Sequence, residues 1–169
     1  MSMSLSCTAQ ATLPCSAEAA FDLSADPVRF PPLFRGYGLI PSIRSITLLS
    51  PLALGCERRV ANSDGSVLTE RVTALQRPHL HAYTLSGFRP PFSWLVRQGV
   101  ASWTFAHTTD ATGAARGCAV EWRYTFTPRA ALSQPFVALL LRCCMQPAMQ
   151  RSLDAMARAC AASLATTPV

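Results

Sequence analysis

Apolar and polar residues alternate with a period of two through most of the middle of the chain. From Ile40 onward, short alternating stretches are separated by glycine, proline, asparagine and aspartate, which is typical of successive antiparallel strands. Together with an opening strand at 4–12, the pattern predicts strands at about 42–49, 55–62, 67–76, 79–86, 97–108 and 118–127. The last six are expected to form one long meander.

Two short helical segments are predicted between the first strand and this meander. Ser16 is a candidate N-cap for a helix that Asp26-Pro27 ends, because a serine oxygen can accept a bond from a free backbone amide of the first turn. A second helical turn is expected over Val28 to Phe34.

A long amphipathic helix is predicted after the meander, from a cap at Ser133 to about Ala162. Its apolar residues recur every three and four positions, at Leu141, Met145, Met149, Leu153, Met156 and Cys160. Pro147 lies inside the helix and is expected to kink or locally break it, because proline lacks an amide hydrogen and crowds the preceding turn.

The composition favours a single domain, 1–169, that does not cross a membrane. The longest apolar stretch, Pro135 to Met145, is interrupted by Arg142 and is too short to span a bilayer. Half of the 169 residues are nevertheless apolar and only 14% are charged. Some of this apolar surplus is expected to line a pocket.

Arginine supplies all of the lysine-or-arginine charge of the chain. All 15 basic residues are arginine, so chemistry that needs a lysine amine, such as Schiff-base formation or a P-loop, is excluded. The net charge of +6 is dispersed, and the only adjacent basic pair is Arg58-Arg59. A nucleic-acid partner is therefore not expected, because such binding needs the charge gathered on one face.

The cysteines and the N-terminus point to a reduced, cytoplasmic protein. Seven cysteines include no C-x-x-C spacing and one adjacent pair, Cys143-Cys144, which predicts buried free thiols and neither a zinc site nor a disulfide framework. The segment Met1 to Leu13 lacks the basic and apolar regions of a secretory signal.

The order of elements resembles the START/Bet v 1-like (SRPBCC) superfamily, and more narrowly its polyketide cyclase/dehydrase and lipid transport branch. The segments that carry the resemblance are Ser16 to Leu23, Gly55 to Val60, Thr69 to Val72, Ala82 to Leu85 and Val120 to Phe126. The resemblance implies an α+β helix-grip fold, in which a curved antiparallel sheet of about seven strands wraps a long C-terminal helix and encloses a cavity. The aromatic segment Gly87 to Trp94 departs from the family pattern.

A charged pair is predicted on the inner face of the sheet. Arg58 lies in phase with Cys56 and Val60, and Glu70 shares a face with Leu68, Val72 and Ala74. If the hairpin closes with the three-residue loop Ser63 to Gly65, Arg58 faces Glu70 directly. The pair is either a structural ion pair or a catalytic one, with Glu70 as acid or base and Arg58 as the electrostatic stabiliser.

Aromatic residues and methionines are candidate ligand contacts under the family resemblance. They lie on strands, in loops expected at the cavity mouth and on the last helix: Tyr83, Trp103, Phe105, Trp122, Tyr124, Phe34, Tyr37, Phe88, Phe92, Trp94, Met145 and Met149. Such stripes also form ordinary core, and the loop 87–98 also suits a dimer contact.

The three histidines, His79, His81 and His107, share strand parity, and one pairing would set His79 opposite His107. No acidic ligand is placed beside them, so solvent-facing or singly bonded histidines are expected, with no metal and no cofactor.

The leading hypothesis is binding of a hydrophobic small molecule, polyketide-, aromatic- or lipid-like, by a monomer or homodimer. Whether the protein also catalyses is left open. A catalytic member of this family would be a cofactor-independent cyclase, dehydratase or isomerase. The alternative is a protein-interaction or dimerisation module that uses the loop 87–98 without catalysis.

Overall fold

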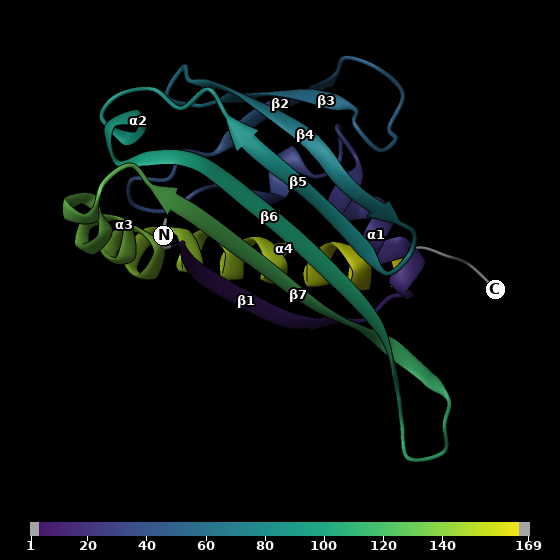
Figure 1. Ribbon diagram of the computed structural model, residues 1–169. Helices are drawn as coiled ribbons and strands as arrows, with labels where there is room; N and C mark the ends of the chain where they lie inside the picture. Colours follow the sequence, from purple (N-terminus) through teal and green to yellow (C-terminus); the bar gives the residue numbers. More distant parts are fainter. Residues whose placement is uncertain (1–3, 166–169) are drawn as a thin grey trace.

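One curved antiparallel sheet forms the framework of the protein in the computed structural model, which describes residues 4–165 (Figure 1). Its strand order is β1-β7-β6-β5-β4-β3-β2. The strands are β1 (Leu5–Leu13), β2 (Ile43–Leu48), β3 (Glu57–Asn62), β4 (Val67–Gln76), β5 (Leu80–Ser86), β6 (Val96–Thr109) and β7 (Ala115–Pro128). Each lies within a few residues of its predicted position, so the opening strand and the long meander are confirmed.

Short helices occupy the connection between β1 and β2, as predicted. They are α1 (Ala17–Ala25) and the 3-10 turn η1 (Pro31–Leu33). The Ser16 hydroxyl accepts a hydrogen bond from the backbone amide of Ala19 at 3.1 Å, which confirms it as the N-cap of α1. A further short helix that the sequence pattern does not predict, α2 (Phe92–Leu95), lies between β5 and β6.

The C-terminal helix is interrupted just before Pro147. Its segments are η2 (Ala131–Ser133), α3 (Gln134–Leu140), the π-helical turn η3 (Leu141–Met145) and α4 (Gln146–Ala165). The amide of Gln146 bonds to the carbonyl of Leu141, five residues back, so Pro147 falls in the first turn of α4, where no amide hydrogen is needed. The predicted local break therefore takes the form of a π turn. Ser133 does not cap α3, because its hydroxyl bonds to the backbone of Ala130.

The sheet wraps around α4, which packs against β1 and crosses the concave face (Figure 1). Beside α1 the interior is filled by aromatic side chains. Trp103 and Trp122 stack with ring centroids 3.9 Å apart, and Phe105 packs edge-on against Phe21 of α1. This end of the grip is closed, which confirms the helix-grip arrangement and leaves free volume toward α2 and α3.

Side-chain parity along the strands follows the prediction except at one β-bulge. Arg58 and Val60 on β3 and Val72 on β4 are buried as expected. Between Val72 and Ala74 the pairing with β5 shifts by one residue, so Leu75 lies opposite the buried His81 and packs against the core. The expectation that Ala74 faces inward is wrong, because the bulge reverses parity beyond Val72.

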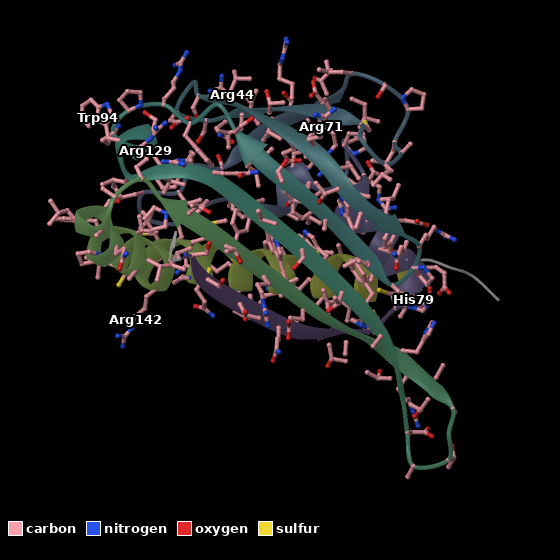
Figure 2. The ribbon with its side chains drawn as sticks, viewed as in Figure 1. Arg44, Arg71, His79, Trp94, Arg129 and Arg142 are labelled. Carbon is pink, nitrogen blue, oxygen red and sulfur yellow. The ribbon has the colours of Figure 1, made fainter. Side chains whose placement is uncertain are left out.

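Most charged side chains and one cysteine, Cys143, lie at the surface. Arg44 and Arg71 lie in the upper part of the view and Arg142 in the lower part, in keeping with the dispersed charge of the sequence (Figure 2). All seven cysteines carry free thiols, but Cys143 is exposed, so the expectation of buried thiols fails there. None of the helices within residues 4–165 is long and apolar enough to cross a membrane.

Candidate functional site

A cavity of about 310 Å³ lies between the curved sheet and the helical segments at the open end of the grip. This volume is at the lower end of the range of small-molecule sites, roughly 300–1,000 Å³. Its walls come from the residues on either side of η1 and the loop that leads to β2, from β3 to β5, from the β5–β6 connection, from β7, and from α3 and η3. The predicted ligand contacts that line it are Phe34, Tyr83, Phe88, Phe92, Trp122, Tyr124 and Met145, together with Glu70.

The remaining predicted contacts lie outside the cavity wall. Trp103, Phe105 and Met149 are buried in the closed core behind it. Tyr37 is 38% exposed, and the guanidinium of Arg151 lies 4.2 Å from the centre of its ring. Trp94 is 70% exposed on α2 and points away from the cavity. Periodicity places a side chain on a face of the sheet but does not say which part of that face borders empty volume.

The predicted charge pair is present in the predicted register. Arg58 lies opposite Glu70 across β3 and β4, and Arg58 Nη2 is 2.6 Å from Glu70 Oε2. Both residues are buried, with 2% and 4% exposure. Glu70 lines the cavity, whereas Arg58 lies behind it. Burial raises the pKa of Glu70 and outweighs the opposing effect of Arg58.

Arg58 extends from Glu70 toward the closed end of the grip. Its guanidinium lies 5.0 Å from the centre of the Tyr83 ring, and its Nε and Nη1 have no hydrogen-bond partner among the described residues. The neighbouring His81 is fully buried, and neither of its ring nitrogens has a partner there. Burial, with a smaller effect of Arg58, lowers the pKa of His81 to about 3, so its ring is neutral.

The expectation of solvent-facing or singly bonded histidines is therefore wrong for His81, whereas His79 and His107 are exposed as expected. His81 is neither solvent-facing nor hydrogen-bonded within residues 4–165. The register of β5 and β6 sets His81 opposite Trp103, and β7 sets Cys118 opposite His107, so His79 does not face His107. Over the described range, no three histidine, cysteine or acidic side chains are grouped so that they could hold a metal ion.

Two tyrosine hydroxyls are available at the cavity wall. Tyr83 and Tyr124 are both buried, and burial is the largest cause that raises the pKa of each phenol. The indole nitrogen of Trp103 donates a long hydrogen bond of 3.5 Å to the Tyr83 oxygen. Both phenols stay protonated near neutral pH and can donate a hydrogen bond to a bound molecule.

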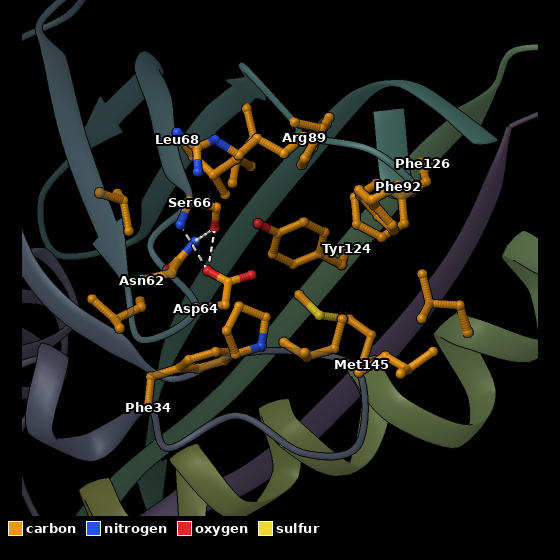
Figure 3. Close-up of a pocket in the computed structure, with 18 of the residues that line it drawn as sticks. Phe34, Asn62, Asp64, Ser66, Leu68, Arg89, Phe92, Tyr124, Phe126 and Met145 are labelled. Carbon is orange, nitrogen blue, oxygen red and sulfur yellow. Dashed lines mark hydrogen bonds between the residues drawn. The ribbon is translucent and has the colours of Figure 1, made fainter. Parts of the chain in front are cut away.

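A second polar group at the β3–β4 turn was not identified from the sequence. Asn62 Nδ2 donates to Ser66 Oγ at 2.9 Å, and the Ser66 hydroxyl donates to Asp64 Oδ1 at 2.6 Å. The side-chain and backbone bonds from Ser66 lower the pKa of Asp64. Figure 3 shows these residues on one side of the cavity and Phe92, Phe126 and Met145 on the other. Extending the parity of Arg58 and Val60 by one step reaches Asn62, so the signal was present.

The aromatic segment between β5 and β6 forms the opposite wall. Phe88 and Phe92 pack edge-on with ring centroids 4.8 Å apart, and both contact Phe126 of β7. The backbone of β6 passes directly beneath them at Gly99, where an added Cβ would lie 2.8 Å from Phe126. The bulky segment that departs from the family pattern therefore lines the cavity with aromatic rings.

Solved structures with the same architecture belong to proteins of low sequence identity. Norcoclaurine synthase from Thalictrum flavum, in complex with dopamine and hydroxybenzaldehyde, superposes with a TM-score of 0.67 at 11% identity, over 99% of this chain and 90% of that one. Ara h 8.0201 superposes with a TM-score of 0.61 at 17% identity, over 98% and 100%. The di-domain ARO/CYC StfQ of the steffimycin biosynthetic pathway superposes at 0.72 and 11%, over 98% of this chain and 54% of that one.

These superpositions establish a shared fold, and the family follows from the sequence. No curated protein matches the chain in sequence. A family model described as polyketide cyclase / dehydrase and lipid transport matches residues 4–161. Because that match spans nearly the whole chain, the protein belongs to the polyketide cyclase/dehydrase and lipid transport family.

Proposed function

We propose that this protein binds a hydrophobic small molecule, polyketide-, aromatic- or lipid-like, in the cavity between the sheet and the C-terminal helix. The observation that carries the proposal is the division of the cavity wall. Polar side chains come from β3 to β5 and the β3–β4 turn, and include Asn62, Ser66, Glu70 and Tyr83. Apart from Arg89 and the hydroxyl of Tyr124, the wall contributed by β7, the β5–β6 connection and η3 is aromatic or apolar. Such a wall suits an apolar molecule with a few oxygen atoms at one side.

Binding of a fluorescent apolar probe, anilinonaphthalene sulfonate, tests this proposal. Leu68 lies on the wall beside Glu70, and Leu68→Trp is expected to fill the cavity and weaken probe binding about tenfold or more. Val67→Trp, one residue earlier on β4, is the matched control, because Val67 is exposed. Equal binding by the two variants would place the probe elsewhere and contradict the proposal.

The family and the position of Glu70 support cofactor-free proton-transfer chemistry in the same cavity. As a carboxylate, Glu70 would take a proton from an activated carbon of the ligand, and as an acid it would return one to a leaving hydroxyl. The hydroxyls of Tyr83 or Tyr124 would donate to the oxygen on which charge develops. Arg58 does not reach the cavity, so its role would be to hold and orient the Glu70 carboxylate from behind.

A generic proton-abstraction substrate separates this chemistry from binding alone. In 5-nitrobenzisoxazole, a base removes the ring C–H proton while the N–O bond breaks to give a phenolate. Glu70→Gln is expected to lower kcat/KM about a hundredfold, and the rate of the unsubstituted protein should rise with pH through the raised pKa of Glu70. Glu57→Gln is the control, since Glu57 is an exposed carboxylate on β3. Unchanged turnover in Glu70→Gln would rule out Glu70 as the base.

The alternative function, a protein-interaction module built on the loop 87–98, has narrower support. Phe88 and Phe92 are turned toward the cavity, which leaves Trp94 as the exposed aromatic residue of the segment. A protein partner for this loop stays a prediction, and the mass of the protein in solution tests its dimeric form.

A further inference from the structure

An apolar stripe on the C-terminal helical region faces away from the cavity and the core. Leu132, Phe136 and Leu139 follow one another at four and three positions, which puts them on one helical face. They are 87%, 61% and 61% exposed. Val137 and Leu140, on the adjoining side of α3, are buried. The stripe is therefore not needed to hold α3 in place, and an exposed Leu-Phe-Leu row of this kind marks an interaction surface.

Trp94 extends the stripe onto the neighbouring helix. Helices α2 and α3 are in contact and lie at the same end of the molecule (Figure 1). Arg129 links them, because its backbone amide donates to the carbonyl of Leu95 and its side chain to that of Ser93. Figure 2 shows Trp94 and Arg129 together at this end, with Arg142 projecting from α3 and η3 below them. We call Trp94, Leu132, Phe136 and Leu139 the docking face.

The charges that border the docking face are all positive. Arg129 and Arg142 are exposed, and neither has a carboxylate partner within salt-bridge distance in the described part of the chain. The sequence has no acidic residue between Glu121 and Asp154, which covers the whole of η2, α3 and η3. It also has none between Glu70 and Asp110, which covers α2. The docking face is thus an apolar surface bordered by unpaired cations.

We propose that the docking face binds the surface of a lipid bilayer that contains anionic lipids. Tryptophan, phenylalanine and leucine insert at the level of the lipid headgroups, and arginines beside them attract the negative surface of the membrane. A second copy of this chain fits less well, because a two-fold contact through the same face would bring Arg129 and Arg142 of both copies together. The docking face is therefore complementary to a negatively charged surface and not to a second copy of itself.

The docking face would place the cavity next to the membrane. Phe92 and Leu95 of α2 and Leu140 of α3 line the cavity, while Trp94 and Leu139 of the same helices belong to the docking face. An apolar molecule leaving a bilayer would meet these two helices first. This passage of ligand rests on the proposed function, whereas the docking itself does not.

Vesicle binding tests the proposal directly. Vesicles of phosphatidylcholine alone and vesicles that also contain phosphatidylglycerol are mixed with the protein and sedimented. The protein is expected to sediment with the anionic vesicles, less so in high salt, and weakly with phosphatidylcholine. Trp94 is exposed whereas Trp103 and Trp122 are buried, so tryptophan emission should shift to the blue on binding and the shift should vanish in Trp94→Phe.

Substitutions on the face give the decisive comparison. Phe136→Ser with Leu139→Ser should weaken vesicle binding about tenfold or more, and Arg129→Gln or Arg142→Gln about fivefold each. Val28→Ser is the control, because Val28 is 77% exposed but follows α1 at the other end of the fold. Melting curves verify that each variant is folded. Binding that is absent, or that is equal in the control and the Phe136/Leu139 variant, overturns the proposal.

Two further measurements separate membrane docking from dimer formation and from ligand binding in the cavity. A wild-type dimer that becomes monomeric in the Phe136/Leu139 variant would show a second copy on the face and overturn the membrane assignment. Leu68→Trp should retain vesicle binding while losing the fluorescent probe, and the Phe136/Leu139 variant should do the reverse. Loss of cavity binding and loss of docking are thereby observed independently.

Discussion

Removal of the cation from the buried pair, with the substitution Arg58→Leu, tests the central electrostatic feature of the site. The two side chains are 2% and 6% exposed, and their closest atoms are 2.6 Å apart. Leaving a buried charge without its partner costs about 3–5 kcal/mol. The attraction between two unit charges about 4 Å apart has a similar size, about 4 kcal/mol at an effective dielectric constant of about 20. We therefore expect the free energy of unfolding to fall by about 3–5 kcal/mol near neutral pH.

The pH dependence of this loss has a definite sign. Burial raises the pKa of Glu70 and Arg58 opposes that rise, so in Arg58→Leu the pKa of Glu70 rises further. A carboxyl whose pKa is higher in the folded than in the unfolded state lowers stability as pH increases above the unfolded value. The slope between the two pKa values is about 1.4 kcal/mol per pH unit. The variant should thus be least stable at alkaline pH and should approach the wild type as the pH falls toward the unfolded pKa of Glu70, where the carboxyl of the folded variant is protonated.

Urea unfolding followed by circular dichroism at pH 5 and pH 8 measures both effects. The double variant Arg58→Leu/Glu70→Leu serves as the matched comparison, since it removes both charges and leaves apolar side chains of moderate size. It should be more stable than Arg58→Leu alone at pH 8. A single variant with the same pH profile as the wild type, or a double variant whose loss equals the sum of the two single losses, would refute the reasoning.

Three other substitutions test separate parts of the structure. Because the pKa of His81 is lowered to about 3, the folded state loses stability as the pH falls below about 6.5, by about 1.4 kcal/mol per pH unit. The substitution His81→Leu should flatten this slope, as measured by unfolding between pH 4 and pH 7. Gly99→Ala places a Cβ 2.8 Å from the Phe126 ring, so the melting temperature should fall with a loss of about 1–3 kcal/mol; an unchanged Tm would show that the ring moves freely. Asp64→Ala removes the acceptor of two bonds from Ser66 and should cost about 1 kcal/mol in urea unfolding at pH 7.

The parts of the fold that follow local rules could be predicted from the sequence. The turn at Asn62 to Ser66 determines the pairing of β3 with β4, so counting back from it places Arg58 opposite Glu70. Likewise, the start of α1 follows from capping by Ser16, and the break before Pro147 follows from the amide hydrogen that proline lacks. In each case the signal lies within a few residues of the structure that it specifies.

Features that depend on distant parts of the chain could not be predicted in the same way. The bulge after Val72 leaves no mark in the alternation, because Ala74 and Leu75 are both apolar. The pairing of β5 with β6 follows a long aromatic connection, so the register of His81 was not set by a tight turn. Whether Arg58 reaches the cavity depends on how far Glu70 and Tyr83 fill the space in front of it, which is a property of the packed interior.

The inner face of the sheet divides into a polar half and an aromatic half. The buried polar side chains of the sheet lie on β3, β4, β5 and the turn that joins the first two of these strands: Arg58, Asn62, Ser66, Glu70 and His81. The inner faces of β6 and β7 carry Trp103, Phe105, Trp122, Tyr124 and Phe126. Because the sheet curls, the two halves face one another across the cavity, and α3 and η3 line it from the helical side. Of these side chains, Asn62, Ser66 and Glu70 line the cavity, where the polar groups of a bound molecule could also bond to them. A pure hydrocarbon could make no bond to these side chains or to the tyrosine hydroxyls at the cavity wall, so the arrangement favours oxygenated apolar ligands.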